Sequence, residues 1–103
     1  MSEETFEDAT VTKRANVYYD GNVTSRTLVG GDGTRRTLGI MHPGEYEFET
    51  EDDEHIELYG GRLRVTIDGE TETYEAGEEL TIPAGTTFEA SIEELVDYCC
   101  TYR

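Results

Sequence analysis

The sequence predicts an all-β protein with a single domain. Apolar residues recur with period two along most of the chain, and hardly anywhere with the ~3.6-residue period of a helix, which is typical of strands with one buried face. Turn-forming residues interrupt these runs at short intervals. The chain has 103 residues, a length that suits one hydrophobic core, so we expect no second domain.

The chain begins with an acidic segment that has little apolar material. Four acidic residues lie between Met1 and Asp8. We therefore expect residues 1–10 to form a flexible lead-in and residues 11–103 to form the folded domain.

The clearest strand lies at residues 45–50, where three glutamates alternate with Tyr46, Phe48 and Thr50. Alternation places these three side chains together on the inner face. The same pattern recurs at residues 63–67, 80–82, 88–92 and 98–102. Turn signals stand at residues 20–21, 30–33, 43–44, 60–61, 68–69, 76–77 and 83–85. They leave room for about eight or nine short strands, which favours a sandwich or a closed barrel.

The charge balance excludes several classes of partner. The chain has 24 acidic and 8 basic residues, a formal net charge of −16, so we expect neither nucleic-acid nor anionic-membrane binding. No apolar run approaches the ~18 residues that cross a bilayer, and the start lacks a signal-peptide pattern, which predicts a cytoplasmic protein. Lys13 is the only lysine. Acidity with so little lysine favours a halophilic source over a merely acidic protein.

Cys99 and Cys100 are neighbours, so they do not form a disulfide framework that staples distant loops, which implies a reducing compartment. Alternation predicts that one of them lies in the core and that the other faces outward.

Two glycine-rich stretches point to a more specific fold. Residues Gly77–Gly85 match the opening of the second cupin motif: a glycine, five residues, a proline, any residue and a glycine. Residues 43–61 have the shape of the first motif, with a glycine, a strand, a loop containing Glu54, a second strand and a closing glycine. The chain thus resembles a small single-domain cupin, a β-barrel of the double-stranded β-helix (jelly-roll) type.

The histidines of the metal-dependent cupins are missing from these motifs. Their three positions fall on Thr50, Asp52 and Phe88, while the two histidines of the chain, His42 and His55, fall elsewhere and are expected to be solvated. Because a zinc or iron site needs three or four ligands around one point, we expect no metal.

The whole chain resembles one family of small cupins, the pyrimidine/purine nucleoside phosphorylases, from about Asn16 to Tyr102. The resemblance rests on residues 15–18, 21–25, 38–41, 43–48 and 97–102. It implies a broad-specificity enzyme that uses orthophosphate to cleave the N-glycosidic bond of ribonucleosides, giving a free base and ribose 1-phosphate. It also implies a small homo-oligomer, which we expect to be a homodimer, without a metal or other cofactor.

Phosphorolysis needs donors for phosphate, and an arginine fork binds phosphate well. Arg35 and Arg36 are adjacent, so only one can face the barrel interior. Counting back from Met41 places Arg35 inside, and the resemblance also favours Arg35, which we expect to bind phosphate. Arg26 is a second candidate. Alternatively, Arg35 is solvated and balances nearby acids.

The inward residues Tyr46, Phe48 and Thr50, with Tyr98 and Tyr102 from the last strand, are expected to hold the sugar and the base. Aromatic faces stack on any base, which suits broad specificity. The alternative is that these aromatic residues are only core.

Glu54 shares a face with Ile56 and Leu58 and should point into the barrel. Burial would raise the pKa of this carboxyl group, which could then protonate the leaving base, or hold ribose hydroxyls if ionised. The alternative is a loop-edge acid, because Asp52 and Asp53 beside it are expected to be solvated. Two other functions remain open: a non-catalytic cupin that binds a small metabolite, and a nucleoside hydrolase that does not use phosphate.

Overall fold

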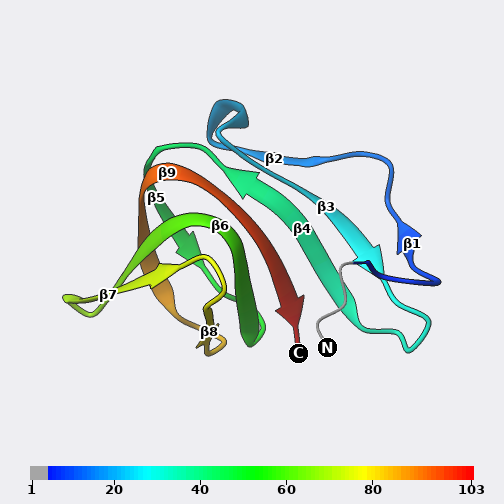
Figure 1. Cartoon of the computed structure of the whole chain (residues 1–103). Helices are drawn as coiled ribbons and strands as arrows, with labels where there is room; N and C mark the ends of the chain where they lie inside the picture. Colours follow the sequence, from blue (N-terminus) through cyan, green and yellow to red (C-terminus); the bar gives the residue numbers. More distant parts are fainter. Residues whose placement is uncertain (1–4) are drawn as a thin grey trace.

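A computed structural model of the chain describes residues 5–103 and confirms the all-β prediction (Figure 1). A single 3-10 turn, η1 (Tyr19–Gly21), interrupts the strands. The strands are β1 (Thr10–Val11), β2 (Asn16–Tyr18), β3 (Val23–Val29), β4 (Arg35–Met41), β5 (Gly44–Glu49), β6 (Glu54–Ile67), β7 (Glu70–Glu75), β8 (Glu79–Ile82) and β9 (Thr87–Tyr102). Most are short as predicted, but β6 has 14 residues and β9 has 16.

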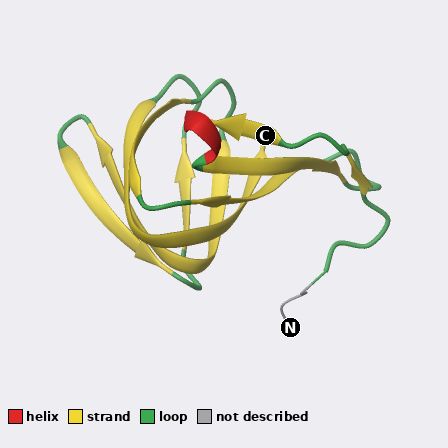
Figure 2. Ribbon diagram, turned by 90° about the horizontal axis from the view of Figure 1, so that it is seen from above, coloured by secondary structure: helices red, strands yellow, loops and turns green. Residues whose placement is uncertain are grey.

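The two long strands connect two layers of sheet. The first half of β9 pairs with β5 and its second half with β4, while β6 pairs with β9 along most of its length. The first half of β6 also pairs with β8, and its second half with β7. One layer is therefore β1/β2-β3-β4-β9-β6-β8 and the other is β5-β9-β6-β7, all antiparallel. Figure 2 shows the strands curling around a common interior, as the cupin motifs predict.

The expected closure of the sheet is not seen among residues 5–103. The hydrogen-bonded path runs from β1 to β7 without joining its ends. The edge strand β7 carries Glu70, Glu72 and Glu75, and charged side chains on an edge discourage pairing with another chain. The sheet is thus bent into the shape of a barrel while its edges remain separate.

The predicted turn at Gly60–Gly61 is wrong, because both glycines lie inside β6. The pairing of β6 with β9 shifts register there, which marks a bulge and not a chain reversal. Gly61 has φ 83°. A Cβ atom at this position would collide with the carbonyl oxygen of Leu95. A glycine pair therefore lets one continuous strand pass from the first layer to the second.

Both cysteines are buried and free, so the prediction that one of the two faces outward is wrong about solvent exposure. Cys99 does lie on the outer face, but β9 is flanked there by β4 and β6, which place Leu38 and Glu57 beside it. Tyr59 also contacts the thiol. Because the cysteine side chain is short, these larger neighbours cover it.

The lead-in is shorter than expected. Thr10 already belongs to β1 and pairs with Val29 of β3. Residues 1–4 lie outside the described residues, so the expected flexibility of the lead-in stays a prediction.

Candidate active site

A cavity of about 240 Å³ lies between the two layers. This is close to the lower end of the ~300–1,000 Å³ usual for small-molecule sites. The residues that line it come from β2, β3, β4, β5, β6 and β9: Tyr18, Val23, Ser25, Thr37, Met41, Phe48, Glu49, Glu54, Ile56, Leu63, Phe88, Ala90, Tyr98, Cys100 and Tyr102. Inward-facing positions of strands from both layers thus meet in one mainly apolar space.

Glu54, the first residue of β6, lines this cavity as predicted. The thiol of Cys100 donates a hydrogen bond to Glu54 Oε1 across 3.4 Å. Burial raises the pKa of the Glu54 carboxyl group, while the bond from Cys100 and the positive charge of Arg35 act in the opposite direction. The alternative of a fully solvated loop-edge acid is therefore wrong.

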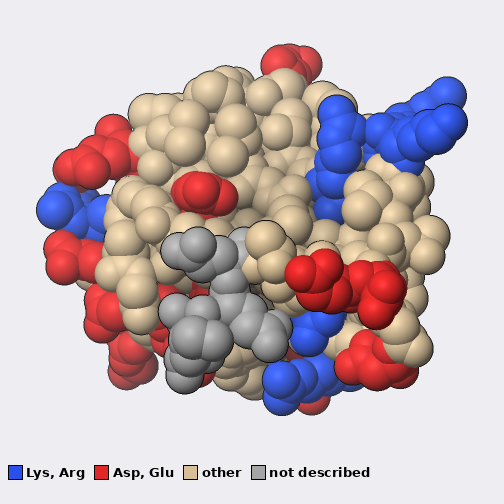
Figure 3. All heavy atoms as spheres, turned by 45° about the vertical axis from the view of Figure 1, so that its right-hand side comes forward, with Lys and Arg blue, Asp and Glu red and all other residues tan. Residues whose placement is uncertain are grey.

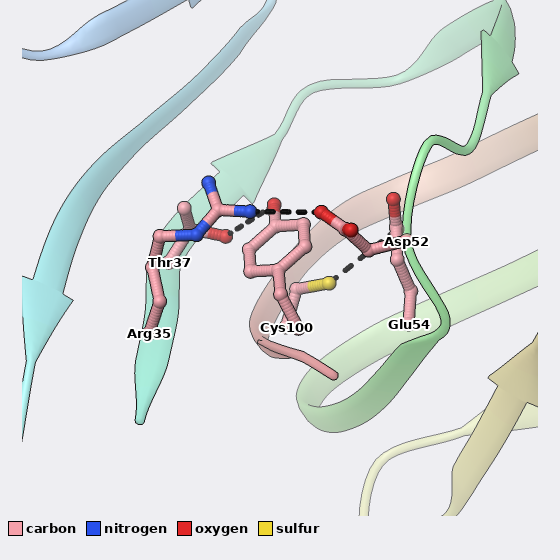
Figure 4. A network of polar contacts seen from close by, with 6 residues as sticks. Arg35, Thr37, Asp52, Glu54 and Cys100 are labelled. Atoms are coloured by element: carbon pink, nitrogen blue, oxygen red, sulfur yellow. Dashed lines mark hydrogen bonds and ion pairs between the residues drawn. The ribbon is translucent and has the colours of Figure 1, made fainter. Parts of the chain in front are cut away.

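Arg35 lies at the rim of the cavity, at the start of β4, and its side chain is half exposed, so the expected position inside the barrel is wrong and the alternative of an arginine that balances a nearby acid fits its contact with Asp52 (Figure 4). Its guanidinium carbon is 4.3 Å from the centre of the Tyr102 ring, and its Nη2 is 3.0 Å from Asp52 Oδ2. The Tyr102 hydroxyl is hydrogen-bonded to Thr37 Oγ1 at 3.1 Å. Figure 4 shows Arg35, Thr37, Asp52, Glu54 and Cys100 directed toward one another from β4, β9, the start of β6 and the loop before β6. The two predicted catalytic residues, Arg35 and Glu54, therefore belong to one cluster.

The loop before β6 is held more firmly than the sequence suggested. Asp52, which we expected to be solvated, forms the ion pair with Arg35, and Asp53 accepts a hydrogen bond from the backbone NH of Ala84 at 2.8 Å. Thr50 is buried, and its hydroxyl donates to the carbonyl oxygen of Pro83 at 2.7 Å. Thr50 therefore holds this loop and is not among the residues that line the cavity.

The predicted aromatic residues divide into two groups. Phe48, Tyr98 and Tyr102 line the cavity. Burial raises the pKa of Tyr98 to about 12, so its phenol is neutral near pH 7. Tyr46 is buried outside the cavity lining, where its hydroxyl donates to the carbonyl oxygen of His42 at 2.7 Å and its ring centre is 5.0 Å from that of Tyr19. Tyr46 is thus a core residue, as the alternative stated.

The other arginines point away from the cavity. Arg26 is exposed on the outer face of β3, and its Nη1 donates to the carbonyl oxygen of Lys13 at 2.8 Å, so the structure does not bring it to Arg35. Arg62 and Arg64 also lie outside the cavity lining, where they pair with Glu75 at 3.3 Å and with Glu93 at 3.2 Å.

Sequence reasoning missed several cavity residues. Thr37 shares the face of Arg35, and Cys100 shares that of Tyr98, so alternation could have found both. Phe88 was considered only as a lost metal ligand, yet its ring centre is 5.4 Å from that of Phe48. Tyr18 carried no sequence signal: it lines the cavity beside the turn η1, where Tyr19 and Asp20 have positive φ.

The histidines are less exposed than expected. His55 Nε2 is 3.5 Å from Glu79, and its side chain is 19% exposed, while His42 is also partly buried. Within residues 5–103, no cluster of three or more His, Cys, Asp or Glu side chains is placed to hold a metal ion. In the same part of the chain, no helix is long and apolar enough to cross a membrane.

Known proteins resemble the chain in both sequence and fold. A protein from Syntrophotalea carbinolica named pyrimidine/purine nucleoside phosphorylase is 49% identical to the chain, over 99% of the chain and 98% of the relative. A crystal structure of an Acinetobacter protein of unknown function superposes with a TM-score of 0.91 and 35% identity, over 96% of this chain and 98% of that one. A cupin-2 domain protein from Shewanella frigidimarina has a TM-score of 0.65 and 23% identity, over 77% and 79% of the two chains, and supports the cupin fold alone.

The model of the family described as pyrimidine/purine nucleoside phosphorylase matches residues 13–102, nearly the whole chain. This match includes every residue of the cluster around Arg35 and Glu54. The chain belongs to the pyrimidine/purine nucleoside phosphorylase family of enzymes.

Proposed function

We propose that this enzyme cleaves the N-glycosidic bond of both purine and pyrimidine ribonucleosides with orthophosphate, giving free base and ribose 1-phosphate. The observation that carries the proposal is that Arg35 at the rim of the cavity and Glu54, a carboxyl group of raised pKa inside it, belong to one cluster. Phosphorolysis needs both an anion-binding group and a proton donor around one ribosyl centre.

In this reaction a phosphate oxygen forms a bond to the anomeric carbon of the ribose while the bond from that carbon to the base nitrogen breaks. Arg35 would hold the phosphate through its guanidinium NH groups, while its guanidinium carbon lies over the ring of Tyr102. Glu54 in its acid form would give its proton to the departing base, and burial keeps that proton bound to a higher pH.

Breadth toward the base would follow from the character of the cavity. Phe48, Phe88, Tyr98 and Tyr102 present ring surfaces, which stack on any base without reading its edge.

We further propose that the enzyme acts in nucleotide salvage, in the cytoplasm, as a homodimer. The free thiols of Cys99 and Cys100 support a reducing compartment.

We also propose that the reaction uses no metal or other cofactor. The positions of the cupin histidines are taken by Thr50, which holds a loop, by Phe88, which lines the cavity, and by Asp52, which pairs with Arg35. The side chains of Thr50 and Phe88 are poor ligands for zinc or iron.

Incubation of the protein with uridine or inosine, with and without phosphate, tests the proposal when free base is followed by chromatography. We expect base release only with phosphate, for both nucleosides, and no effect of EDTA. Release without phosphate would indicate a hydrolase, and binding without release would indicate a non-catalytic cupin. Loss of activity in EDTA with recovery by one divalent ion would contradict the metal-free proposal.

A further inference from the structure

The anion-binding edge of Arg35 is already occupied by a carboxylate of the same chain. Arg35 Nη2 lies 3.0 Å from Asp52 Oδ2, and both side chains are about half exposed, at 50% and 48%. No lysine or arginine lines the cavity in the described part of the chain. Arg35, which contacts the lining residue Tyr102 from the rim, is therefore the basic residue to which we assign phosphate binding. A phosphate at this edge of Arg35 would have to take the place of Asp52.

The loop around Asp52 is fastened on both sides of this residue. Before it, the Thr50 hydroxyl donates to Pro83, and the backbone NH of Gly85 donates to the carbonyl oxygen of Thr50 at 2.9 Å. After it, the carboxylate of Asp53 accepts a hydrogen bond from the backbone NH of Ala84. The carbonyl oxygen of Asp53 accepts another from the backbone NH of Arg103 at 3.0 Å. The main chain therefore stays in place when the Asp52 side chain turns.

Arg35 has its own support. Its guanidinium carbon lies over the ring of Tyr102, and the Tyr102 hydroxyl is in turn hydrogen-bonded to Thr37. A cation–π contact of this kind uses none of the guanidinium NH groups as hydrogen-bond donors, so they stay available to an anion. Loss of the Asp52 contact would thus leave the edge of Arg35 still presented at the rim.

We propose that Asp52 is an internal competitor of phosphate, which exchanges with the substrate anion on Arg35 and so sets the affinity of the enzyme for phosphate. The inference rests on the proposed function for its biological meaning, but the exchange itself concerns anion binding alone. It identifies Asp52 as a specificity-determining residue that weakens the binding of one substrate and leaves the nucleoside unaffected.

The test is titration of inorganic phosphate into the protein by calorimetry at constant ionic strength, with no nucleoside present. Asp52→Asn should lower the Kd for phosphate about two- to fivefold, the factor that an exposed ion pair contributes. Glu51→Gln is the matched control, because it removes the same charge from an exposed position of the same loop and should leave the Kd within twofold. In steady-state assays, Asp52→Asn should lower the KM for phosphate and not that for inosine.

A double-mutant cycle separates exchange on Arg35 from a general effect of charge. In an Arg35→Ala background, the gain from Asp52→Asn should disappear, because no guanidinium remains to be released. A gain that persists in that background, a Kd in Asp52→Asn equal to that of Glu51→Gln, weaker phosphate binding in Asp52→Asn, or no phosphate binding by any variant would each overturn the inference. Thermal melting of each variant verifies that it is folded.

The outcomes also separate this inference from the proposed function. Phosphate-dependent base release by the wild type, with no change of phosphate Kd in Asp52→Asn, would contradict only the exchange. Absent or phosphate-independent base release, with tighter phosphate binding in Asp52→Asn, would contradict the phosphorolysis and support the exchange.

Discussion

Glu54 is the residue whose environment most directly connects burial to chemistry. Burial raises the pKa of its carboxyl group, so the folded protein holds this proton more tightly than the unfolded chain does. The free energy of unfolding therefore falls as the pH rises from the usual carboxyl pKa through the raised pKa of Glu54. Activity that needs the acid form should fall over the same pH window.

We expect Glu54→Gln to lower kcat about 10²- to 10⁴-fold, because the amide cannot give a proton to the leaving base. Its melting temperature should also depend less on pH above the usual carboxyl range. Glu57→Gln, which lies on the opposite face of β6, is the control and should retain activity. Equal activity of the two variants in phosphorolysis assays would exclude Glu54 as the acid.

Arg35→Ala should raise the KM for phosphate about ten- to a hundredfold and that for the nucleoside much less. The lost charge-assisted hydrogen bond costs ~1.5–3 kcal/mol. Arg62→Ala removes an equal charge from the outer face and should change little. Similar phosphate KM values for the two variants would show that Arg35 does not bind phosphate.

Side chains on strands were the predictable part of the site. Alternation predicted the correct face for Glu54, Arg35 and Phe48, because strand pairing determines which face each residue takes, but it did not show that Arg35 lies half exposed at the rim and not inside the barrel. Asp52 was misjudged because no periodicity applies inside a loop, and its partner lies 17 residues away in the chain. Tyr46 and Phe48 share one face of β5, but only Phe48 lines the cavity. Which of the two residues does so depends on where along the strand the cavity lies, and the sequence does not give that position.

At the scale of the elements, β6 depends on the bulge at Gly60–Gly61. Strand patterns were recognised because side chains alternate within each layer, but a glycine pair was interpreted as a turn. Local sequence does not distinguish a chain reversal from a bulge inside a long strand. The distinction depends on β9, which pairs with β6 on both sides of the bulge.

Gly61→Ala should lower the free energy of unfolding by about 2–4 kcal/mol, since it adds backbone strain to a collision with the Leu95 carbonyl oxygen. Gly69→Ala is the matched control: Gly69 has φ 81°, but its Cβ would meet nothing within 4 Å. That variant should lose only about 1–2 kcal/mol. Urea unfolding measures both, and equal losses would contradict the role assigned to the Leu95 contact.

At the scale of the whole molecule, charge is distributed very unevenly along the chain. Residues 1–40 hold six acidic and five basic residues, whereas residues 41–103 hold 18 acidic and three basic, a formal charge of −15. In Figure 3, the most prominent group of basic side chains stands at the upper right, and acidic side chains occupy much of the left edge and also the lower right. Arg35 belongs to the nearly neutral part of the sequence, but the fold brings Asp52 and Glu54 of the acidic part close to it.

Added KCl should raise the melting temperature until screening saturates near molar concentrations. Folding concentrates the carboxylates, and the Debye length shrinks from ~10 Å at 0.1 M to ~3 Å at 1 M salt. Screening should also help phosphate to approach a protein of net charge −16, so activity should rise as well. Melting curves up to ~2 M KCl test this, and a flat or falling melting temperature would argue against a halophilic source.

The position of β9 in the chain determines when the enzyme can form during its synthesis. β9 follows all its partners in the sequence, and both layers are joined through it, to β4 and β5 on one side and to β6 on the other. While residues 87–102 are still inside the ribosome, β4, β5 and β6 lack their common partner β9, so neither layer is complete. The cavity also lacks Phe88, Tyr98, Cys100 and Tyr102 until then. A nascent chain must therefore remain unaggregated until residues 87–102 have been translated and released, and the abundant carboxylates of residues 41–103 suit that requirement, because like charges keep unfolded chains apart.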